Sequence, residues 1–474
     1  METTSTVTLQ DTIETLLKSK KYATLRDILT TMNPVDIAAI FEELQDEKMP
    51  LLYRLLPKDI AADTFVEMDD ETQKFLIHSL SDTELKEVLD DMFLDDMVDM
   101  IEEMPANVVK RILRQSSPEE RKQINMLLKF PEDSAGSIMT TELVILRPSM
   151  TAEEAIKRIR RTGVDKETIY TCYVADNLSK LIGIITIKDL LLADDDTKVS
   201  ELMDTNVISV MTLTDQEEVA SIIKKYDFLA VPVVDKENRL VGIITVDDAV
   251  DVMQEEATED IQKMAAITPN TDTPYLKIGI FDTWKSRIPW LLLLMISATF
   301  TGMIISSFED ALASSVVLTA FIPMLMDTGG NSGSQSSVTI IRALSLHEIQ
   351  FKDLVKVIWK EVRVALMCGV ALSLAAFAKV ILVDRILLGN PDVTVYVALV
   401  VCLTLAITVV VAKIIGCCLP MFAYKLGFDP AVMASPFITT IVDAVSLVVY
   451  FLIATSLSLI HISEPTRLRS ISYA

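Results

Sequence analysis

The sequence predicts a multidomain membrane protein with an N-terminal α-helical superhelix, a tandem α/β pair, a linking helix and a five-helix all-α transmembrane domain. Residues 1–270 hold 54 acidic against 29 basic residues, whereas residues 271–474 hold 13 against 14. The second half also contains nearly all the long apolar runs of a chain that is 50% hydrophobic. An acidic half that favours water is therefore joined to a membrane half.

Residues 1–132 are predicted to form the superhelix because a 24-residue period runs through them. Its clearest units begin at a proline or a helix-capping residue: Asn33, Pro57, Ser81 and Pro105. Each unit contains two short helical stretches separated by a polar break. A helical hairpin of this size cannot bury its own apolar face, so the units are expected to stack on one another.

A second repeat predicts the α/β pair over residues 135–253, with copies at 135–200 and 201–253. The segment GIITIKD at 183–189 recurs as GIITVDD at 242–248, and each copy reads as strand, helix, strand, strand, helix. The pattern resembles a tandem pair of CBS domains. Such pairs commonly bind adenine nucleotides, so the resemblance implies a cleft for ATP with Asp189 and Asp248 near the ribose. The alternative is a regulatory scaffold whose cleft stays empty.

Residues 247–270 are predicted to be the linking helix, and five spans are expected within residues 280–460. About 20 apolar residues cross a bilayer core, and the apolar stretches are 288–308, 311–326, 364–388, 393–415 and 433–460. Basic residues gather before the first span, between the second and third, and between the fourth and fifth, where we place Lys413 and Lys425. The positive-inside rule then puts the N-terminus and the α/β pair in the cytoplasm and the C-terminus outside. No secretory signal opens the chain, which agrees with this orientation.

Composition excludes several classes of protein. The five cysteines form no CxxC pair and only three histidines occur, which argues against a disulfide framework and against zinc or copper sites. Any bound metal is expected to be a hard cation that prefers oxygen ligands. We find no phosphate-binding loop, catalytic triad or nucleophile elbow, so we expect no enzyme. We also expect no nucleic acid partner.

Residues 321–337 are rich in glycine and hydroxyl side chains at membrane depth. Irregular or polar backbone is tolerated there only where protein or a water-filled cavity surrounds it, and we predict such surroundings, which are compatible with the next interpretation. The alternative is tight packing of small residues against a neighbouring helix.

Asp443 is predicted to lie two to three turns into the otherwise apolar last span. Acids inside a membrane usually mark ion pathways. Thr439 lies one turn earlier, Pro436 is expected to free a backbone carbonyl, and Asn331 is expected opposite. These oxygens suit a divalent cation. The alternative for Asp443 is a structural hydrogen bond to another helix. Lys379, in the middle of the third span, is expected to snorkel or to face a cavity.

Two motifs together resemble the MgtE family of magnesium channels and transporters. They are Pro323…Gly329-Gly330-Asn331-x-Gly333-x-Gln335 and Asp429-Pro430…Pro436…Thr439-Thr440-x-x-Asp443. The resemblance covers almost the whole chain. It implies a homodimer in the lipid bilayer of the bacterial inner membrane, with potential-driven influx of partly hydrated Mg²⁺ between the two membrane regions; other divalent cations are possible cargo. The implied pore residues are Asp443, Thr439, Asn331, Gly329 and Gly330.

The same resemblance implies that cytosolic Mg²⁺ closes the pore by binding acidic side chains. The implied sensing residues are Asp95, Asp99, Asp227, Asp248, Asp251, Glu256, Glu259 and Asp429. Many other acids of the helical repeats have a simpler role, because acids in the first turn of a helix complement its dipole.

Two rival functions and one terminal feature complete the interpretation. A CBS-regulated anion channel requires cationic residues or helix N-termini along its path, whereas this path offers Asp443. A membrane-tethered nucleotide sensor needs no intramembrane carboxylate.

Residues 461–474 resemble translated sequencing-adaptor read-through, and we expect them to be a non-native tail.

Overall fold

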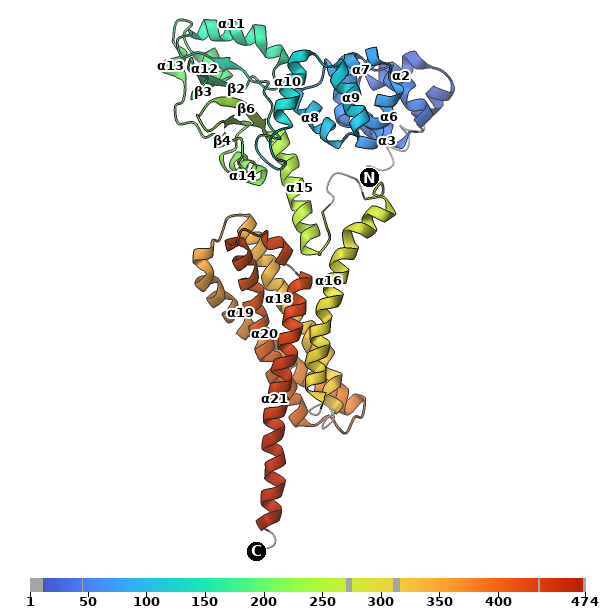
Figure 1. Ribbon diagram of the computed structural model, residues 1–474, viewed down its shortest axis with the longest axis vertical. Helices are drawn as coiled ribbons and strands as arrows, with labels where there is room; N and C mark the ends of the chain where they lie inside the picture. The colour runs from blue at the N-terminus through green and yellow to red at the C-terminus, as the bar shows by residue number, and fades with distance from the viewer. Residues whose placement is uncertain (1–11, 45, 270–274, 310–315, 434, 472–474) are drawn as a thin grey trace. The chain divides into compact units, whose positions relative to one another are not determined.

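The computed structural model describes residues 12–44, 46–269, 275–309, 316–433 and 435–471, with backbone alone after Ser456. The chain divides into two compact units, Met1–Gln254 and Glu255–Ala474. Figure 1 shows the helices and strands of both units, coloured along the chain.

The first unit opens with a stack of short helices, two from each 24-residue repeat (Figure 1). The helices are α2 (Tyr22–Leu29), α3 (Pro34–Glu43), η1 (Asp46–Lys48), α4 (Met49–Tyr53), α5 (Lys58–Val66), α6 (Asp70–Ser79), α7 (Asp82–Leu89), α8 (Leu94–Glu103), α9 (Ala106–Gln115) and α10 (Pro118–Leu127). The four predicted unit starts are the N-cap residues of α3, α5, α7 and α9. Fully buried Phe41, Leu52, Phe65 and Leu76 belong to one core that runs through consecutive units. The predicted stacking of helical hairpins is therefore confirmed.

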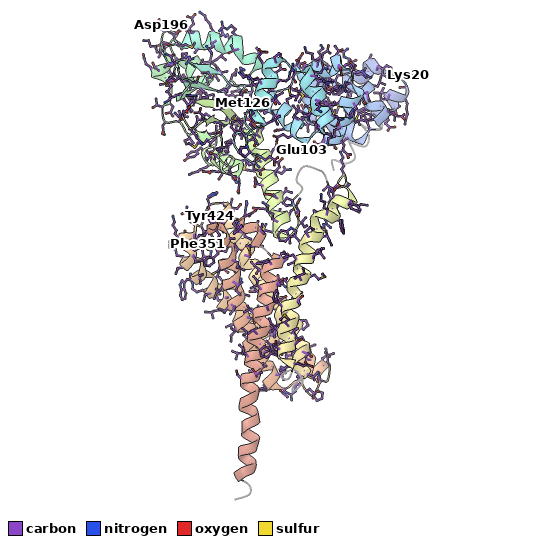
Figure 2. All side chains as sticks on the ribbon, in the orientation of Figure 1. Lys20, Glu103, Met126, Asp196, Phe351 and Tyr424 are labelled. Atoms are coloured by element: carbon purple, nitrogen blue, oxygen red, sulfur yellow. The ribbon has the colours of Figure 1, made fainter. Side chains whose placement is uncertain are left out.

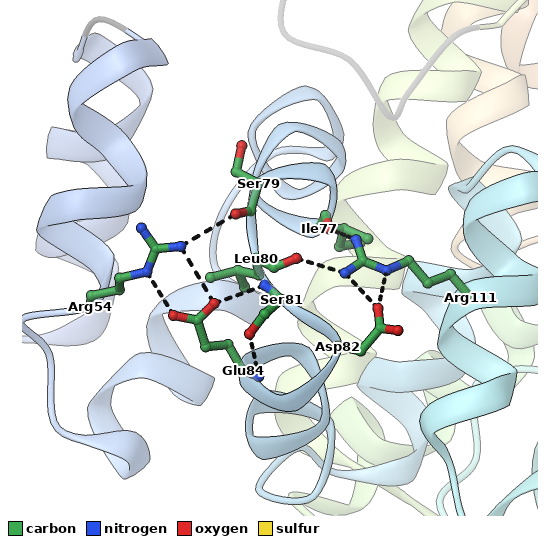
Figure 3. Close-up of polar contacts among 8 residues, drawn as sticks. All are labelled: Arg54, Ile77, Ser79, Leu80, Ser81, Asp82, Glu84 and Arg111. Carbon is green, nitrogen blue, oxygen red and sulfur yellow. Dashed lines mark hydrogen bonds and ion pairs between the residues drawn. The ribbon is translucent and has the colours of Figure 1, made fainter.

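Two arginines tie successive units together (Figure 3). Arg54 Nε donates to Glu84 Oε1 at 2.7 Å, and Glu84 also completes a capping box with Ser81 at the start of α7. Arg111 donates to the carbonyl oxygens of Ile77 and Leu80 and forms an ion pair with Asp82 at 2.8 Å. These bonds satisfy carbonyls at the end of α6 that have no partner within their own helix.

Two three-stranded sheets of the same topology follow. Their strands are β1 (Ile145–Leu146), β2 (Thr171–Ala175), β3 (Leu181–Thr186), β4 (Val210–Met211), β5 (Ala230–Val234) and β6 (Leu240–Thr245). In each sheet the first strand pairs in parallel with the second, and the second pairs antiparallel with the third. The accompanying helices are α11 (Ala152–Thr162), η2 (Gly163–Asp165), α12 (Ile187–Leu192), α13 (Val199–Leu202) and α14 (Gln216–Tyr226).

The recurring glycines of the two copies have a packing reason. A Cβ added at Gly183 would lie 2.7 Å from Met203 Sδ, and one added at Gly242 would lie 2.8 Å from Met139 Sδ. The glycine of each copy therefore packs against a methionine of the other copy, and this close contact explains why glycine recurs at both positions.

Helix α15 (Val246–Met264) runs from the second sheet into the membrane half. The sequence predicts this helix to end near Thr268-Pro269, and it ends at Met264, followed by Ala266 with a φ of 54°. A left-handed residue just after the last turn is a common way to end a helix.

The second unit is helical. Its elements are α16 (Ile280–Ser307), η3 (Val316–Phe321), α18 (Ile322–Ser345), η4 (Phe351–Asp353), α19 (Leu354–Lys379), the π-helix η5 (Val380–Leu387), α20 (Val395–Lys425), η6 (Pro430–Met433) and α21 (Ser435–Ile471). In the described part of the chain, four helical segments are long and apolar enough to cross a membrane: Ile280–Ser307, Phe351–Leu387, Val395–Lys425 and Pro430–Ser456. The predicted second span falls on η3 and the start of α18, and its residues 311–315 lie outside the described chain. Helix α18, which contains the rest of that predicted span, is not one of these four segments.

Helix α18 packs along both α20 and α21, and α19 packs on α20, whereas α16 lies along α21 (Figure 1). The core between them includes Leu325, Val401, Leu405, Tyr450 and Phe451. At one end of this bundle, marked by Phe351 and Tyr424 in Figure 2, the Phe351 ring lies 4.2 Å from Lys425 Nζ. Apolar side chains remain on the outside of the helices, as a lipid environment requires.

Candidate ion path and cation-sensing carboxylates

Helix α18 (Ile322–Ser345) stays regular through its glycines, and these glycines pack closely against neighbouring helices, as the second interpretation expects. A Cβ added at Gly329 would lie 2.8 Å from Thr408 Cγ2 and 2.9 Å from Ser446 Oγ. One added at Gly330 would lie 2.8 Å from Thr439 Cγ2. The helix satisfies its own backbone hydrogen bonds, and the missing side chains let α20 and α21 approach closely.

Asp443 lies on α21, between the buried residues Val442 and Ser446. Its Oδ1 atom is buried and has no hydrogen-bond partner among the described residues. The alternative structural hydrogen bond is therefore not made by this oxygen. Pro436 lies in the first turn of α21, where it frees no carbonyl inside the helix, and its own carbonyl accepts a hydrogen bond from Thr440 Oγ1 at 3.0 Å. The carbonyl ligand expected near Thr439 stays a prediction.

The other predicted pore residues are only partly gathered around Asp443. Thr439 lies one turn before Asp443, packs against Gly330, and places its Oγ1 3.4 Å from Ser334 Oγ. Asn331 is exposed, and its Nδ2 donates to Asp327 Oδ1 at 3.1 Å. The four-residue spacing of Asp327 and Asn331 within a helix is a signal that sequence reasoning had available and missed.

Two lysines of the membrane half are paired. Lys413 was expected in a loop between the last two spans, but α20 continues to Lys425, and Lys413 is 5% exposed with its Nζ 3.8 Å from Glu361 Oε2. The Ser336 hydroxyl also donates to this carboxylate. Lys379 binds the carboxylate of Asp384 at 2.8 Å. Lys413 and Glu361 are both buried, and buried charges persist when they are paired in this way, whereas Lys379 is exposed.

The first unit contains four carboxylates that lie close together: Asp95, Asp96, Glu167 and Asp248. We call them the acidic cluster. Asp95 is 8% exposed, and its Oδ1 has no hydrogen-bond partner among the described residues. Burial, followed by the charges of Asp96, Asp248 and Glu167, raises the pKa of Asp95 to about 9. Burial and repulsion from Asp248 also raise the pKa of Asp96 to about 6 and that of Glu167 to about 7.

Asp248 belongs to this cluster and not only to the predicted ribose contact. Burial raises its pKa, although hydrogen bonds from Thr245 oppose the shift. Thr245 Oγ1 donates to Asp248 Oδ2 at 2.6 Å, and in the first copy Thr186 Oγ1 donates to Asp189 Oδ2 at 2.5 Å. The two copies thus keep the same threonine–aspartate turn, while Asp189 stays exposed and outside the cluster.

Sequence reasoning missed some neighbours of the cluster. Asp63 and Glu67 repel Asp96, and their four-residue spacing on α5 is a signal that a search for acidic helix faces would find. Glu167 lies in the loop before β2, and no local pattern distinguishes it. No group of three or more acidic, histidine or cysteine side chains within the described residues has the spacing of a formed metal site.

The remaining predicted sensing residues have varied surroundings. Asp99 is exposed on α8, and Asp227 is exposed at the end of α14, where its φ of 53° shows that it terminates the helix. Asp251 is exposed on α15 and repels Glu67. Glu256 is half-buried on the same helix. The structure thus gathers Asp95 and Asp248, with Asp251 at the edge.

Glu259 and Asp429, in the second unit, are joined by a lysine. Lys263 Nζ lies 2.7 Å from Glu259 Oε1 and 2.7 Å from Asp429 Oδ2. Burial lowers the pKa of Lys263, but the hydrogen bonds that it donates to Asp429 and Glu259 outweigh this effect and raise the pKa overall. We call this group the lysine bridge. It holds the end of α15 to the turn before α21, where Met264, Ile341 and Ala431 also pack together.

A helical superhelix, a pair of α/β modules and long apolar helices carrying an internal acid define a membrane transport protein with cytosolic N-terminal domains. Residues 322–453 match the MgtE family, described as divalent cation transporters. Residues 32–133 match the MgtE intracellular N domain, and residues 135–196 and 199–255 match CBS domains.

Two relatives match over nearly their full length. The magnesium transporter MgtE of Thermus thermophilus is 37% identical over 91% of this chain and 94% of the relative. The magnesium transporter MgtE of Bacillus subtilis is 35% identical over 93% of this chain and 95% of the relative. The chain belongs to the MgtE family, which is a family of transporters and not of enzymes.

Solved structures match the first half of the chain. The soluble part of a magnesium transporter is 32% identical, with a TM-score of 0.50, and covers 53% of this chain and 99% of that chain. The cytosolic domain of the Mg²⁺ channel MgtE in complex with ATP is 38% identical, with a TM-score of 0.49, and covers 51% and 99%.

Proposed function

We propose that this protein is a channel-like Mg²⁺ transporter for potential-driven influx, in which Asp443 binds the partly hydrated ion. The observation that carries this proposal is the buried Asp443 Oδ1, which has no hydrogen-bond partner in the described part of the chain. A carboxylate left unpaired inside a membrane is unfavourable unless it binds a cation or accepts hydrogen bonds from water. Membership of a family of divalent cation transporters supports the same assignment.

The chemistry of the site favours an ion that keeps water. Mg²⁺ dehydrates reluctantly and is usually held by one or two carboxylates together with several waters. Asp443 with the Thr439 hydroxyl provides such a sparse set of oxygens. Moving two charges through 100 mV releases about 4.6 kcal/mol, twice the value for one charge, so influx needs no ATP.

We further propose a homodimer in the bacterial inner membrane, with the path between the two membrane regions and the C-terminus outside. Each subunit then contributes one Asp443, and the pair of carboxylates matches the charge of one divalent cation. Other divalent cations of similar size are possible cargo. ATP is proposed to bind the CBS pair beside Asp189, where the exposed threonine–aspartate turn leaves carboxylate oxygen free to meet a ribose hydroxyl.

Cytosolic Mg²⁺ is proposed to close the path by neutralising the acidic cluster. Like charges in a half-buried site repel strongly, and divalent cations remove this repulsion. When Mg²⁺ is lost, the superhelix and the CBS pair separate, and α15 transmits the change to the membrane half. The raised pKa values of Asp95, Asp96 and Glu167 support this proposal, because they record how strongly the folded unit resists uncompensated charge there.

The test of the pore assignment is Mg²⁺ flux into liposomes containing the full chain, under an inside-negative potential. Asp443→Ala is expected to lower flux at least tenfold. Asp392→Ala removes an exposed acid from the turn before α20 and serves as the control. Normal flux through Asp443→Ala would show that the ion path lies elsewhere.

A further inference from the structure

One face of α18 is polar and exposed. Asp327, Asn331 and Gln335 recur at intervals of four residues, and all three are exposed. The opposite face is buried, where Gly329, Gly333 and other small residues meet α20 and α21. The exposed face of a helix within a membrane bundle meets either lipid or water.

Lipid is excluded by the chemistry of this face. A carboxylate on a lipid-facing surface is strongly disfavoured, and acids within spans almost always face the bundle interior or a water-filled cavity. Asp327 is moreover aligned by its neighbour, since Asn331 Nδ2 donates to its Oδ1 atom. This bond fixes one oxygen of the carboxylate and leaves the other to bind water or a cation.

The packing of α18 on α21 locates Asp327 along the path. Added Cβ atoms at Gly333, Gly330 and Gly329 would meet Ile438, Thr439 and Ser446 in turn. Residue numbers along α18 decrease in the direction in which those along α21 increase, so the two helices are antiparallel. Asp327 lies about one turn beyond Asn331, toward the end of α21 that is distant from Ser435.

We infer that Asp327 is a second carboxylate of the ion path, which attracts a hydrated divalent cation on the outer side of Asp443. The inference rests on the proposed function and its orientation. Asp443 Oδ1, buried without a partner among the described residues, independently indicates a cation at the next position inward. Two acids in succession let an ion be captured with its water shell at Asp327 and then pass to Asp443.

The role of Asp327 differs from that of Asp443 in what it controls. An outer carboxylate raises the local concentration of cations and so sets the external Mg²⁺ concentration that half-saturates flux. It does not set the maximum flux, which depends on passage through the inner site. Screening by salt weakens an exposed charge of this kind.

The test compares full-length variants in liposomes, with external Mg²⁺ varied at low and at high ionic strength. Asp327→Asn is expected to raise the half-saturating Mg²⁺ concentration about tenfold, to leave maximum flux within about twofold, and to lose most of its effect at high salt. Asp327→Glu keeps the charge and is expected to restore half-saturation near the original value. Asp392→Asn, a matched loss of one outer acid away from α18, is expected to behave as the unmodified protein.

Unchanged half-saturation in Asp327→Asn would overturn the inference, as would a Glu variant that is as impaired as the Asn variant. A fall in maximum flux at unchanged half-saturation would also overturn it, because this indicates a structural role. Asp443→Ala separates the two proposals. If it abolishes flux while Asp327→Asn behaves normally, only the outer site fails; if it conducts normally, the proposed function fails.

Discussion

The acidic cluster and the lysine bridge solve the same electrostatic problem in different ways. In the lysine bridge, Lys263 lies 2.7 Å from each of two carboxylates, so the group contains its own cation. In the acidic cluster the carboxylates instead repel one another, and burial and repulsion raise the pKa of Asp95 to about 9. The difference teaches that the first group is held without any added ion, whereas the second is stable only with protons or with an external cation.

The largest expected effect is a pH dependence of the acidic cluster that Mg²⁺ removes. Asp95, Asp96 and Glu167 have folded pKa values of about 9, 6 and 7, against ordinary values of 3.8, 3.8 and 4.5. Between these limits the folded unit holds protons that the unfolded chain releases, so stability is greatest at low pH and falls as pH rises. Without Mg²⁺, hydrogen-exchange protection of α8 is expected to fall roughly a hundredfold from pH 5.5 to 8.5, or about 2.7 kcal/mol.

Millimolar Mg²⁺ is expected to flatten this dependence and to protect the soluble half from proteolysis at pH 8.5. The control is α2, which is remote from the cluster in sequence and carries none of its acids. Equal protection of α8 with and without Mg²⁺ at pH 8.5 would mean that the cluster does not bind the cation.

A smaller effect is expected from Asp95→Asn, which removes the most buried charge of the cluster and keeps its shape. Without Mg²⁺ at pH 8.5 the variant is expected to be more stable by about 1–3 kcal/mol, the usual penalty of a buried polar group without a partner. At pH 5.5 the gain is expected to be smaller, because the stability lost by keeping Asp95 protonated grows from the ordinary pKa of 3.8 up to the folded pKa of about 9. Asp90→Asn, at an exposed position after α7, is the control for both hydrogen-exchange measurements. A gain of equal size at both pH values would contradict the assignment to charge.

The smallest effect is expected from Lys263→Met, which leaves Glu259 and Asp429 to repel each other. These side chains are about a third exposed or less, so solvent reduces the loss to about 1 kcal/mol or less. Hydrogen exchange over residues 255–264 is expected to become several-fold faster without Mg²⁺, and Mg²⁺ is expected to reverse the change by replacing the ammonium group. Lys356→Met removes an 84% exposed lysine from an ion pair with Asp353 and is expected to change nothing. Unchanged exchange in Lys263→Met would show that the bridge contributes no stability.

The sequence was sufficient where the relevant information is local. The repeat starts at Asn33, Pro57, Ser81 and Pro105 are N-caps in the structure, because capping depends on a few adjacent residues. The order of strands along the chain in both CBS copies follows from the alternation of apolar and polar residues and from the turn residues between the strands. Asp443 was singled out from the sequence because one acid within a long apolar run stands out without any knowledge of its neighbours in space.

Local information failed where distant segments meet. Lys413 lies near a predicted span end, where a basic residue suggests a loop. In the structure α20 continues through it, and its side chain pairs with Glu361, some fifty positions earlier in the chain. The glycines of α18 suit either an irregular segment or a close helix contact, and their neighbours on α20 and α21 decide between the two. A pattern along the chain cannot distinguish these cases, since both need small residues.

By itself, then, the sequence determined the order of domains, the acidic character of the first half and the single intramembrane acid of the last helix. Periodicity, caps and hydropathy are properties of neighbouring residues, and they persist whatever the tertiary structure. The tertiary structure alone decided which carboxylates share a site: Asp95 with Glu167 and Asp248, and Glu259 with Asp429 through Lys263. The reason is physical, because Coulomb energy and desolvation depend on distance through space and on burial, neither of which is written in the spacing of residues along the chain.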